Sequence, residues 1–183
     1  MPRIPLADGR FVEVEQTVFL DTCVFVCSIM PGHPEQSEAQ QFLARLVVSA
    51  HQGQMRLLCS SLVMFEFCHT AAKYRYEQVN GRGSWSQLGT GDKNQYFGSI
   101  AEAIEGYTRA VSALPITWTH AWSNRVGIES AIATVRDHGV GFADACHYAA
   151  MDSDGARQIL TNDADFKRIP GVLWVSYVSE RNQ

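Results

Sequence analysis

One run of apolar residues limits the choice of fold more than any other part of the chain. Residues 17–26, TVFLDTCVFV, are β-branched, aromatic or otherwise apolar, and only Asp21-Thr22 interrupts them. A strand with one face in water alternates apolar and polar residues, whereas a strand covered on both faces can be apolar throughout. Helices cover both faces of a parallel sheet. The run therefore predicts a buried strand in a parallel sheet.

Strand-like and helical segments alternate along the rest of the chain, with Pro115 and Gly139 as breaks between helices. This alternation predicts an α/β fold with a central, mainly parallel sheet flanked by helices. The further strands are expected at 55–61, 158–161 and 172–178, and the helices at 34–53, 62–79, 96–114, 119–138 and 141–155.

Two segments stand apart from this alternation. Asp8-Gly9 lies between two short apolar runs, which is typical of a hairpin with a two-residue turn. Residues 80–94, NGRGSWSQLGTGDKN, contain four glycines and little periodicity, which predicts a mobile loop. At 183 residues we expect one domain over 1–183, with a hairpin extension at 1–16 and a loop insertion at 80–94.

Composition excludes some classes of protein. The net charge of −4 argues against a protein that coats nucleic acid by charge alone, but it allows an acidic metal centre beside a local basic rim. No apolar run approaches the ~18 residues of a membrane span. The first ten residues, MPRIPLADGR, lack the apolar core of a signal peptide. We therefore expect a cytoplasmic protein without a membrane partner.

Five cysteines and no Cys-x-x-Cys pair indicate reduced thiols rather than a disulfide framework. Cys23 and Cys27 are four residues apart, and Cys68-His69 and Cys146-His147 are adjacent pairs. A zinc site assembled from them is an alternative, but the spacing matches no standard zinc pattern. Free cysteines are commonly buried, and burial is the interpretation we favour.

Two aspartates follow predicted strands directly. Asp21 interrupts the first apolar run, and Asp163 follows the run ILTN. Ligands of open α/β sheets bind beyond the carboxyl ends of the strands, so both carboxylates are expected at one rim. The alternative for Asp163 and Asp165 is a turn in which they cap a short helix over 165–169.

Two further carboxylates fall on predicted helices. Glu66 lies between Phe65 and Phe67, where burial is costly unless a cation or hydrogen bonds compensate the charge. The alternative is a glutamate on an exposed helical stripe. Asp144 opens the helix after GVGFA, and there the alternative is an aspartate favoured by the helix dipole.

The order of these motifs, FLDT, FE, FADACHYAA and LTNDADF, resembles that of the PIN-domain nucleases, in particular the VapC-like toxins, over about residues 18–178. The resemblance implies a three-layer α/β sandwich that cuts RNA with Mg²⁺ or Mn²⁺. It further implies a homodimer held inactive by an antitoxin. The implied metal-binding and catalytic residues are Asp21, Glu66, Asp144 and Asp163, with Asp165 accessory and with Thr22, Thr161 and Asn162 as supporting hydrogen-bond formers.

This chemistry suits carboxylates. Hard oxygen ligands bind Mg²⁺ or Mn²⁺, and the ion polarises the scissile phosphate and activates a water. Clustered acids without a cation are expected to have raised pKa values. One departure from the family pattern is Cys23, which stands where many relatives have asparagine.

Other functions remain open at this stage. A haloacid-dehalogenase-type phosphatase needs a second aspartate at the position of Cys23. A PIN fold can also act as an RNA- or protein-binding module with little cleavage, because fold does not fix function. The long N-terminal segment and the glycine-rich loop are also compatible with an RNA-processing nuclease that is not a toxin.

The glycine-rich loop carries one more hypothesis. Arg82 and Lys93 offer positive charge for phosphates, and Trp85 offers a flat face for an unstacked base. The loop would then close over RNA at the mouth of the acidic site. The alternative is a solvated spacer between helices.

Overall fold

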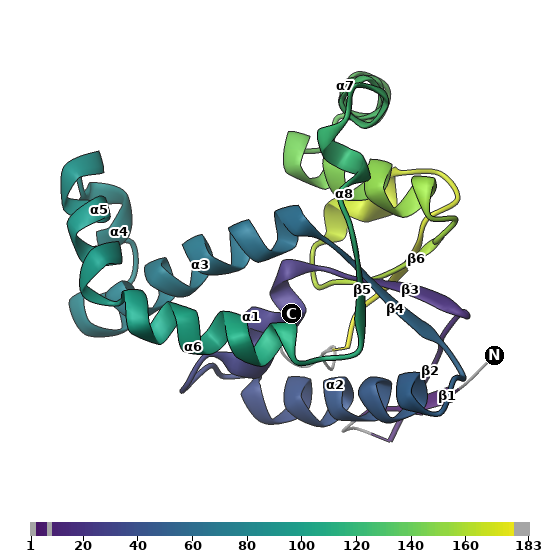
Figure 1. Ribbon diagram of the computed structural model, residues 1–183, viewed down its shortest axis with the longest axis horizontal. Coiled ribbons are helices and arrows are strands. Elements are labelled where there is room, and N and C mark those ends of the chain that lie inside the picture. The colour runs from purple at the N-terminus through teal and green to yellow at the C-terminus, as the bar shows by residue number, and fades with distance from the viewer. Residues whose placement is uncertain (1–2, 7–8, 178–183) are drawn as a thin grey trace.

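A computed structural model describes residues 3–6 and 9–177. Its centre is a five-stranded sheet in the order β5-β4-β3-β6-β7, and every neighbouring pair is parallel. This confirms the predicted α/β architecture with a central parallel sheet (Figure 1). The strands are β3 (Thr17–Leu20), β4 (Arg56–Ser60), β5 (Ile116–Thr119), β6 (Gln158–Leu160) and β7 (Leu173–Val175).

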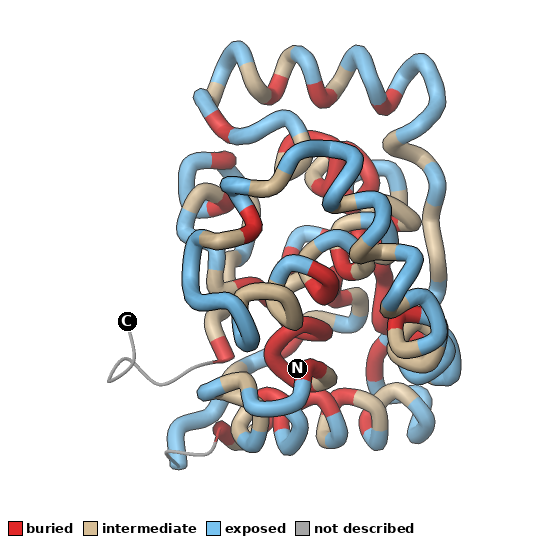
Figure 2. Tube along the Cα trace, turned by 90° about the vertical axis from the view of Figure 1, so that its left-hand side faces the viewer, coloured by how far each residue is buried: buried red, intermediate tan, exposed pale blue. Residues whose placement is uncertain are grey.

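Helices cover both faces of the sheet. Figure 1 shows α1 (Thr22–Ile29) and α2 (Gln36–His51) on one side, and α7 (Arg125–His138) and α8 (Phe142–Ser153) on the other. The helix α7 turns a single face inward, and in Figure 2 its buried positions recur about once per turn along the top of the molecule. Among the described residues, no helix combines the length and apolar character needed to cross a bilayer.

A helical arm extends from the sheet. The helix α3 (Ser61–Asn80) runs outward from β4, α4 (Ser84–Gln87) and α5 (Thr90–Ser99) lie at its far end, and α6 (Ala101–Ser112) returns to β5 (Figure 1). The expectation of a loop over 80–94 is therefore wrong for residues 84–87 and 90–94, which are helical. Trp85 is only 4% exposed, because its ring packs against aromatic neighbours. The ring centroids of His69, Tyr76, Tyr96 and Phe97 lie 5.8–6.1 Å from that of Trp85.

The apolar run at 17–26 is not one strand. The strand β3 ends at Leu20, and α1 begins at Thr22. Asp21 causes this change, because its side chain accepts a 2.6 Å hydrogen bond from the Thr22 N–H and caps the helix. Both halves of the run are buried, the first within the sheet and the second within a covering helix, so their composition alone does not separate them.

The expected helix over 119–138 is wrong at its start. Residues 116–119 form β5, which pairs in parallel with β4 at the edge of the sheet. A short 3-10 helix, η1 (Ala121–Ser123), follows, and α7 begins only after Asn124. Asn124 caps α7 by accepting a 2.8 Å hydrogen bond from the Gly127 N–H.

The N-terminal segment pairs as a hairpin of β1 (Arg3–Pro5) and β2 (Phe11–Glu13). The connection is longer than the expected two-residue turn, because it spans 6–10, and Asp8 lies outside the described residues. The Gln158 side chain joins this hairpin to β6: it donates to Glu13 O at 2.8 Å and accepts from the Glu15 N–H at 2.8 Å.

Candidate active site

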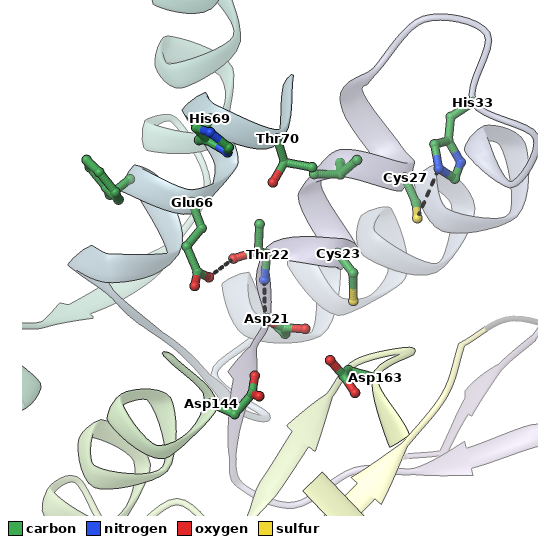
Figure 3. Close-up of a pocket in the computed structure, with 12 residues that line it drawn as sticks. Asp21, Thr22, Cys23, Cys27, His33, Glu66, His69, Thr70, Asp144 and Asp163 are labelled. Carbon is green, nitrogen blue, oxygen red and sulfur yellow. Dashed lines mark hydrogen bonds between the residues drawn. The ribbon is translucent and has the colours of Figure 1, made fainter. Parts of the chain in front are cut away.

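An acidic cleft lies at the carboxyl ends of the parallel strands. Its volume is about 660 Å³, and its walls include four carboxylates that reach it from four separate elements (Figure 3). Asp21 follows β3, Asp163 follows β6, Glu66 lies on α3 and Asp144 lies in the first turn of α8. The structure thus brings together the four carboxylates that the sequence singles out.

Asp21 is held in place by two hydrogen bonds. Its Oδ1 accepts from the Thr22 N–H at 2.6 Å, and its Oδ2 accepts from the Thr161 hydroxyl at 2.5 Å. The side chain is almost fully buried, with the residue 7% exposed. Thr161 also accepts from the Asp163 N–H at 2.9 Å, so one buried hydroxyl connects the ends of β3 and β6.

Glu66 faces the cleft rather than an exposed helical stripe. Its Oε2 accepts from the Thr22 hydroxyl at 2.8 Å and from His147 Nε2 at 2.9 Å. Burial alone raises the pKa of this carboxyl, but the hydrogen bonds from His147 and Thr22 outweigh burial. The net pKa lies below the usual value, so Glu66 is ionised at neutral pH.

His147 is the site residue that the sequence reasoning did not assign. The residue is 1% exposed, and Nδ1 lies 3.1 Å from Ser60 Oγ while Nε2 bonds to Glu66. Burial alone lowers the pKa of the imidazole, but the hydrogen bond to Glu66 and the charge of Asp21 raise it above the ordinary value. His147 follows Asp144 by three residues, so the two side chains lie on the same face of α8. This spacing is the sequence signal that could have indicated His147 as a site residue.

Asp144 is the carboxyl that the cluster perturbs most clearly. Burial and the nearby charges of Asp163 and Asp21 raise its pKa from an ordinary 3.8 to about 6. Figure 3 shows its side chain facing those two aspartates across the cleft. Raised proton affinity is the behaviour expected of an acidic cluster without a cation.

Asp163 both lines the acidic cleft and caps a short helix, so each of the two interpretations of its sequence motif describes part of its role. It lines the cleft, and its Oδ1 also accepts from the Asp165 N–H at 2.9 Å, which caps the 3-10 helix η2 (Ala164–Arg168). Asp165 is not among the residues that line the cleft, and its Oδ1 lies 3.5 Å from an Arg168 nitrogen. The structure therefore places Asp165 beside the site as part of a turn.

The supporting residues form one network behind the carboxylates. Asn162 donates from its side chain to Glu35 at 3.3 Å and accepts from the Ser176 hydroxyl at 2.9 Å. Its backbone N–H donates to Cys23 Sγ at 3.3 Å. Burial raises the pKa of the Cys23 thiol well above its usual value, so this side chain stays protonated. Cys23 is therefore a neutral, packed group behind the carboxylates.

The residues present fit a hard divalent cation. Oxygen donors dominate the acidic part of the cleft, and one ligand atom each of Asp21, Glu66 and His147 lie within 4.8 Å of one another. No Lys or Arg is among the described residues that line the cleft. No Lys or Arg side chain among these lining residues neutralises the negative charge, and carboxylate oxygens are the ligands that Mg²⁺ and Mn²⁺ prefer.

The three candidate RNA-binding residues of the helical arm do not line the cleft. Trp85 is buried, so its ring has no free face for a base in this structure. The Lys93 ammonium lies 5.7 Å from the centre of the Trp85 ring. Only Arg82 is fully at the surface. The indole contributes to the packing of the arm, because burying it removes a large apolar area from water.

The fold has counterparts among known proteins. The structure is similar to that of VapC20 from Mycobacterium tuberculosis, a toxin that cleaves the sarcin-ricin loop, with TM-score 0.53, 15% identity and coverage of 82% of this chain and 92% of the other. It is also similar to VapBC2 from Rickettsia felis, bound to a DNA fragment from their promoter, with TM-score 0.52, 16% identity and coverage of 87% and 98%. At such identities these similarities show a shared fold.

Sequence comparison gives the family directly. No curated protein sequence matches the chain. The family model of the PIN domain matches residues 18–172, a span that includes all four cleft carboxylates. The chain belongs to the PIN domain family.

Proposed function

We propose that this protein is a Mg²⁺- or Mn²⁺-dependent endoribonuclease that hydrolyses phosphodiester bonds of RNA, and that it is the toxin of a toxin-antitoxin module. The observation that carries the proposal is the cleft, where four carboxylates converge without a Lys or Arg among the described lining residues. So many like charges are stable together only when cations bind between them. Membership of the PIN domain family supports nuclease activity.

Asp21, Glu66, Asp144 and Asp163 are the residues that would hold the metal. A bound Mg²⁺ or Mn²⁺ supplies Lewis acidity toward the scissile phosphate and an activated water near neutral pH. The protein contributes negative charge at fixed positions. Without metal, Asp144 is about half protonated at about pH 6, because burial and the charges of Asp163 and Asp21 raise its pKa. Metal binding has to release that bound proton.

Neighbouring side chains orient the ligands. Thr161 donates to Asp21 Oδ2, and Thr22 and His147 donate to Glu66 Oε2. Both bonds to Glu66 fall on Oε2, so its Oε1 remains available to a metal. Each oxygen of Asp21 accepts one hydrogen bond and keeps a second lone pair for a metal. Such partners typically change metal affinity or activity by about 10- to 100-fold when they are lost.

Phe65 is our candidate for contact with the substrate. It lines the cleft next to Glu66, yet it is 73% exposed, which is unusual for a large apolar side chain. A flat exposed ring at the mouth of a phosphate-binding cleft suits stacking on an unpaired base. We propose that the substrate is single-stranded or looped RNA and that Phe65 provides the stacking face that Trp85 cannot offer.

The structural counterparts support the biological part of the proposal. One is described as a toxin that cleaves the sarcin-ricin loop, and the other as a VapBC2 assembly on promoter DNA. We propose by analogy that this protein forms a homodimer, that an antitoxin protein restrains it, and that it acts on RNA in the cytoplasm.

The test is RNA cleavage by the purified chain. Wild type should cut single-stranded RNA with Mg²⁺ or Mn²⁺ and stop when EDTA is added. Asp21→Asn should be inactive, whereas Asp152→Asn, the same change at an exposed position outside the cleft, should remain active. RNA binding without cleavage would favour the binding-module alternative, and cleavage that persists in EDTA would refute the metal-dependent mechanism.

A further inference from the structure

A second group of potential metal ligands lies apart from the four carboxylates. Cys27 lies in the last turns of α1, and His33 and Glu35 lie in the connection between α1 and α2. One donor atom from each residue lies within 4.8 Å of the other two. Cys27 is 5% exposed, and the other two side chains are partly buried. This Cys27-His33-Glu35 cluster has no part in the proposed nuclease mechanism.

The distances within the cluster are those of ligands that share one ion. Cys27 Sγ lies 3.7 Å from His33 Nε2 and 3.3 Å from Glu35 Oε2. Tetrahedral Zn²⁺ holds sulfur at about 2.3 Å and nitrogen or oxygen at about 2.0 Å, which separates the ligand atoms by about 3.5 Å. The two separations from Cys27 Sγ are therefore close to those around one ion, and the donor atoms of His33 and Glu35 lie within 4.8 Å of each other.

The cluster differs from the acidic group in position and in chemistry. Cys27 lies about 9 Å farther along α1 than Asp21, at ~1.5 Å per residue. Figure 3 shows Cys27 and His33 at the far side of the cleft from Asp144 and Asp163. A thiolate and an imidazole select a borderline-soft ion such as Zn²⁺, whereas carboxylates alone suit Mg²⁺.

We propose that Cys27, His33 and Glu35 form a Zn²⁺ site in the wall of the active-site cleft. Cys27 and His33 line that cleft. With three protein ligands, the fourth position is left for water or for a phosphate oxygen of bound RNA. Glu35 also accepts a hydrogen bond from Asn162, next to Asp163, so an ion at this site contacts the network that supports the carboxylates.

Binding requires two changes within the cluster. The Cys27 thiol donates to Glu35 Oε2 in the structure, so its proton passes to solvent as the zinc–sulfur bond forms. The Glu35 N–H donates to His33 Nδ1 at 3.3 Å. Coordination through Nε2 places the ring proton on Nδ1, so this long contact is lost. Because a proton is released, zinc affinity should increase with pH.

Cobalt titration of the full-length, metal-free protein tests the site. Co²⁺ in a tetrahedral site with a thiolate gives a sulfur-to-cobalt charge-transfer band in the near ultraviolet. We expect one equivalent of Co²⁺ to produce that band, Zn²⁺ to displace it, and excess Mg²⁺ to leave it unchanged. Glu35→Gln, which nearly preserves shape, should weaken Co²⁺ binding about tenfold or more.

Cysteine variants decide which thiol is the ligand. Cys27→Ser should abolish the band, and Cys23→Ser and Cys68→Ser should retain it. Absence of the band in folded wild type would overturn the proposal, and so would a band that survives Cys27→Ser. Asp21→Asn separates the two proposals, because it should lose RNA cleavage and keep the cobalt band.

Discussion

Replacement of Asp144 by asparagine should stabilise the metal-free protein while it abolishes RNA cleavage. Burial and the charges of Asp163 and Asp21 raise the pKa of Asp144 from an ordinary 3.8 to about 6. The difference corresponds to about 3 kcal/mol of unfavourable burial and charge repulsion when the carboxyl is ionised. Because the group is only half-buried, solvent screening reduces this to about 1–2 kcal/mol. Asparagine removes the charge and keeps the shape.

The effect should depend on pH with a definite sign. A carboxyl whose pKa is higher in the folded state than in the unfolded state destabilises the folded state as the pH rises. The loss of stability begins near the unfolded pKa and is complete above the folded pKa. For Asp144 this loss of stability occurs between pH 3.8 and about pH 6. The variant and wild type should therefore have similar stability at about pH 4, and the variant should be more stable at about pH 8.

Urea unfolding in EDTA at these two pH values measures the difference. His147 also loses its stabilising charge as the pH rises through its raised pKa. This occurs in both proteins, and Asp144 contributes less to that pKa than Glu66 and Asp21 do, so most of the effect cancels in the comparison. Mg²⁺ should then stabilise wild type more than the variant, because it binds the folded acidic cluster. A variant that is no more stable than wild type at about pH 8 would refute the repulsion argument.

Three further substitutions separate substrate contact from packing. Phe65→Ala should weaken RNA binding by about 1–3 kcal/mol with little loss of stability, as measured by RNA affinity and by thermal unfolding; unchanged affinity would remove Phe65 from the substrate site. Trp85→Ala should lower the free energy of unfolding by about 3 kcal/mol, because the ring is 4% exposed; equal stability in urea would contradict its packing role. Gly127→Ala should destabilise the protein by about 1–3 kcal/mol, since an added Cβ would collide with the backbone oxygen of Ala121; the calorimetric midpoint checks this.

The parts of the site that follow strands could be predicted from the sequence. Asp21 and Asp163 terminate apolar runs, and parallel strands bring such ends to one rim, so their proximity follows from topology. Glu66 stood out because its neighbours are large and apolar. His147 did not, because a histidine within an alanine-rich helix has the pattern of an ordinary core residue; only the fold shows that it reaches Glu66 at 2.9 Å.

The errors in the fold have local physical causes. The residues after Asp21 are apolar in either a buried strand or a buried helix, and the cap at Asp21 decides between them. The strand β5 is only four residues long and lies at the edge of the sheet, where pairing with β4 overrides weak local preference. Glycines at 80–94 suggested a loop, but this segment contains helical residues that pack through the aromatic cluster around Trp85.

The most direct test of the nuclease mechanism is to map RNA ends in cells after brief induction of wild type and of Asp21→Asn. Asp21 is 7% exposed and lines the cleft together with the other three carboxylates, and the substitution removes one ligand charge with almost no change of shape. We predict discrete new RNA ends that accumulate with wild type and are absent with Asp21→Asn at equal protein levels. Identical RNA ends in the two samples would contradict the assignment of these carboxylates to a metal-dependent ribonuclease site.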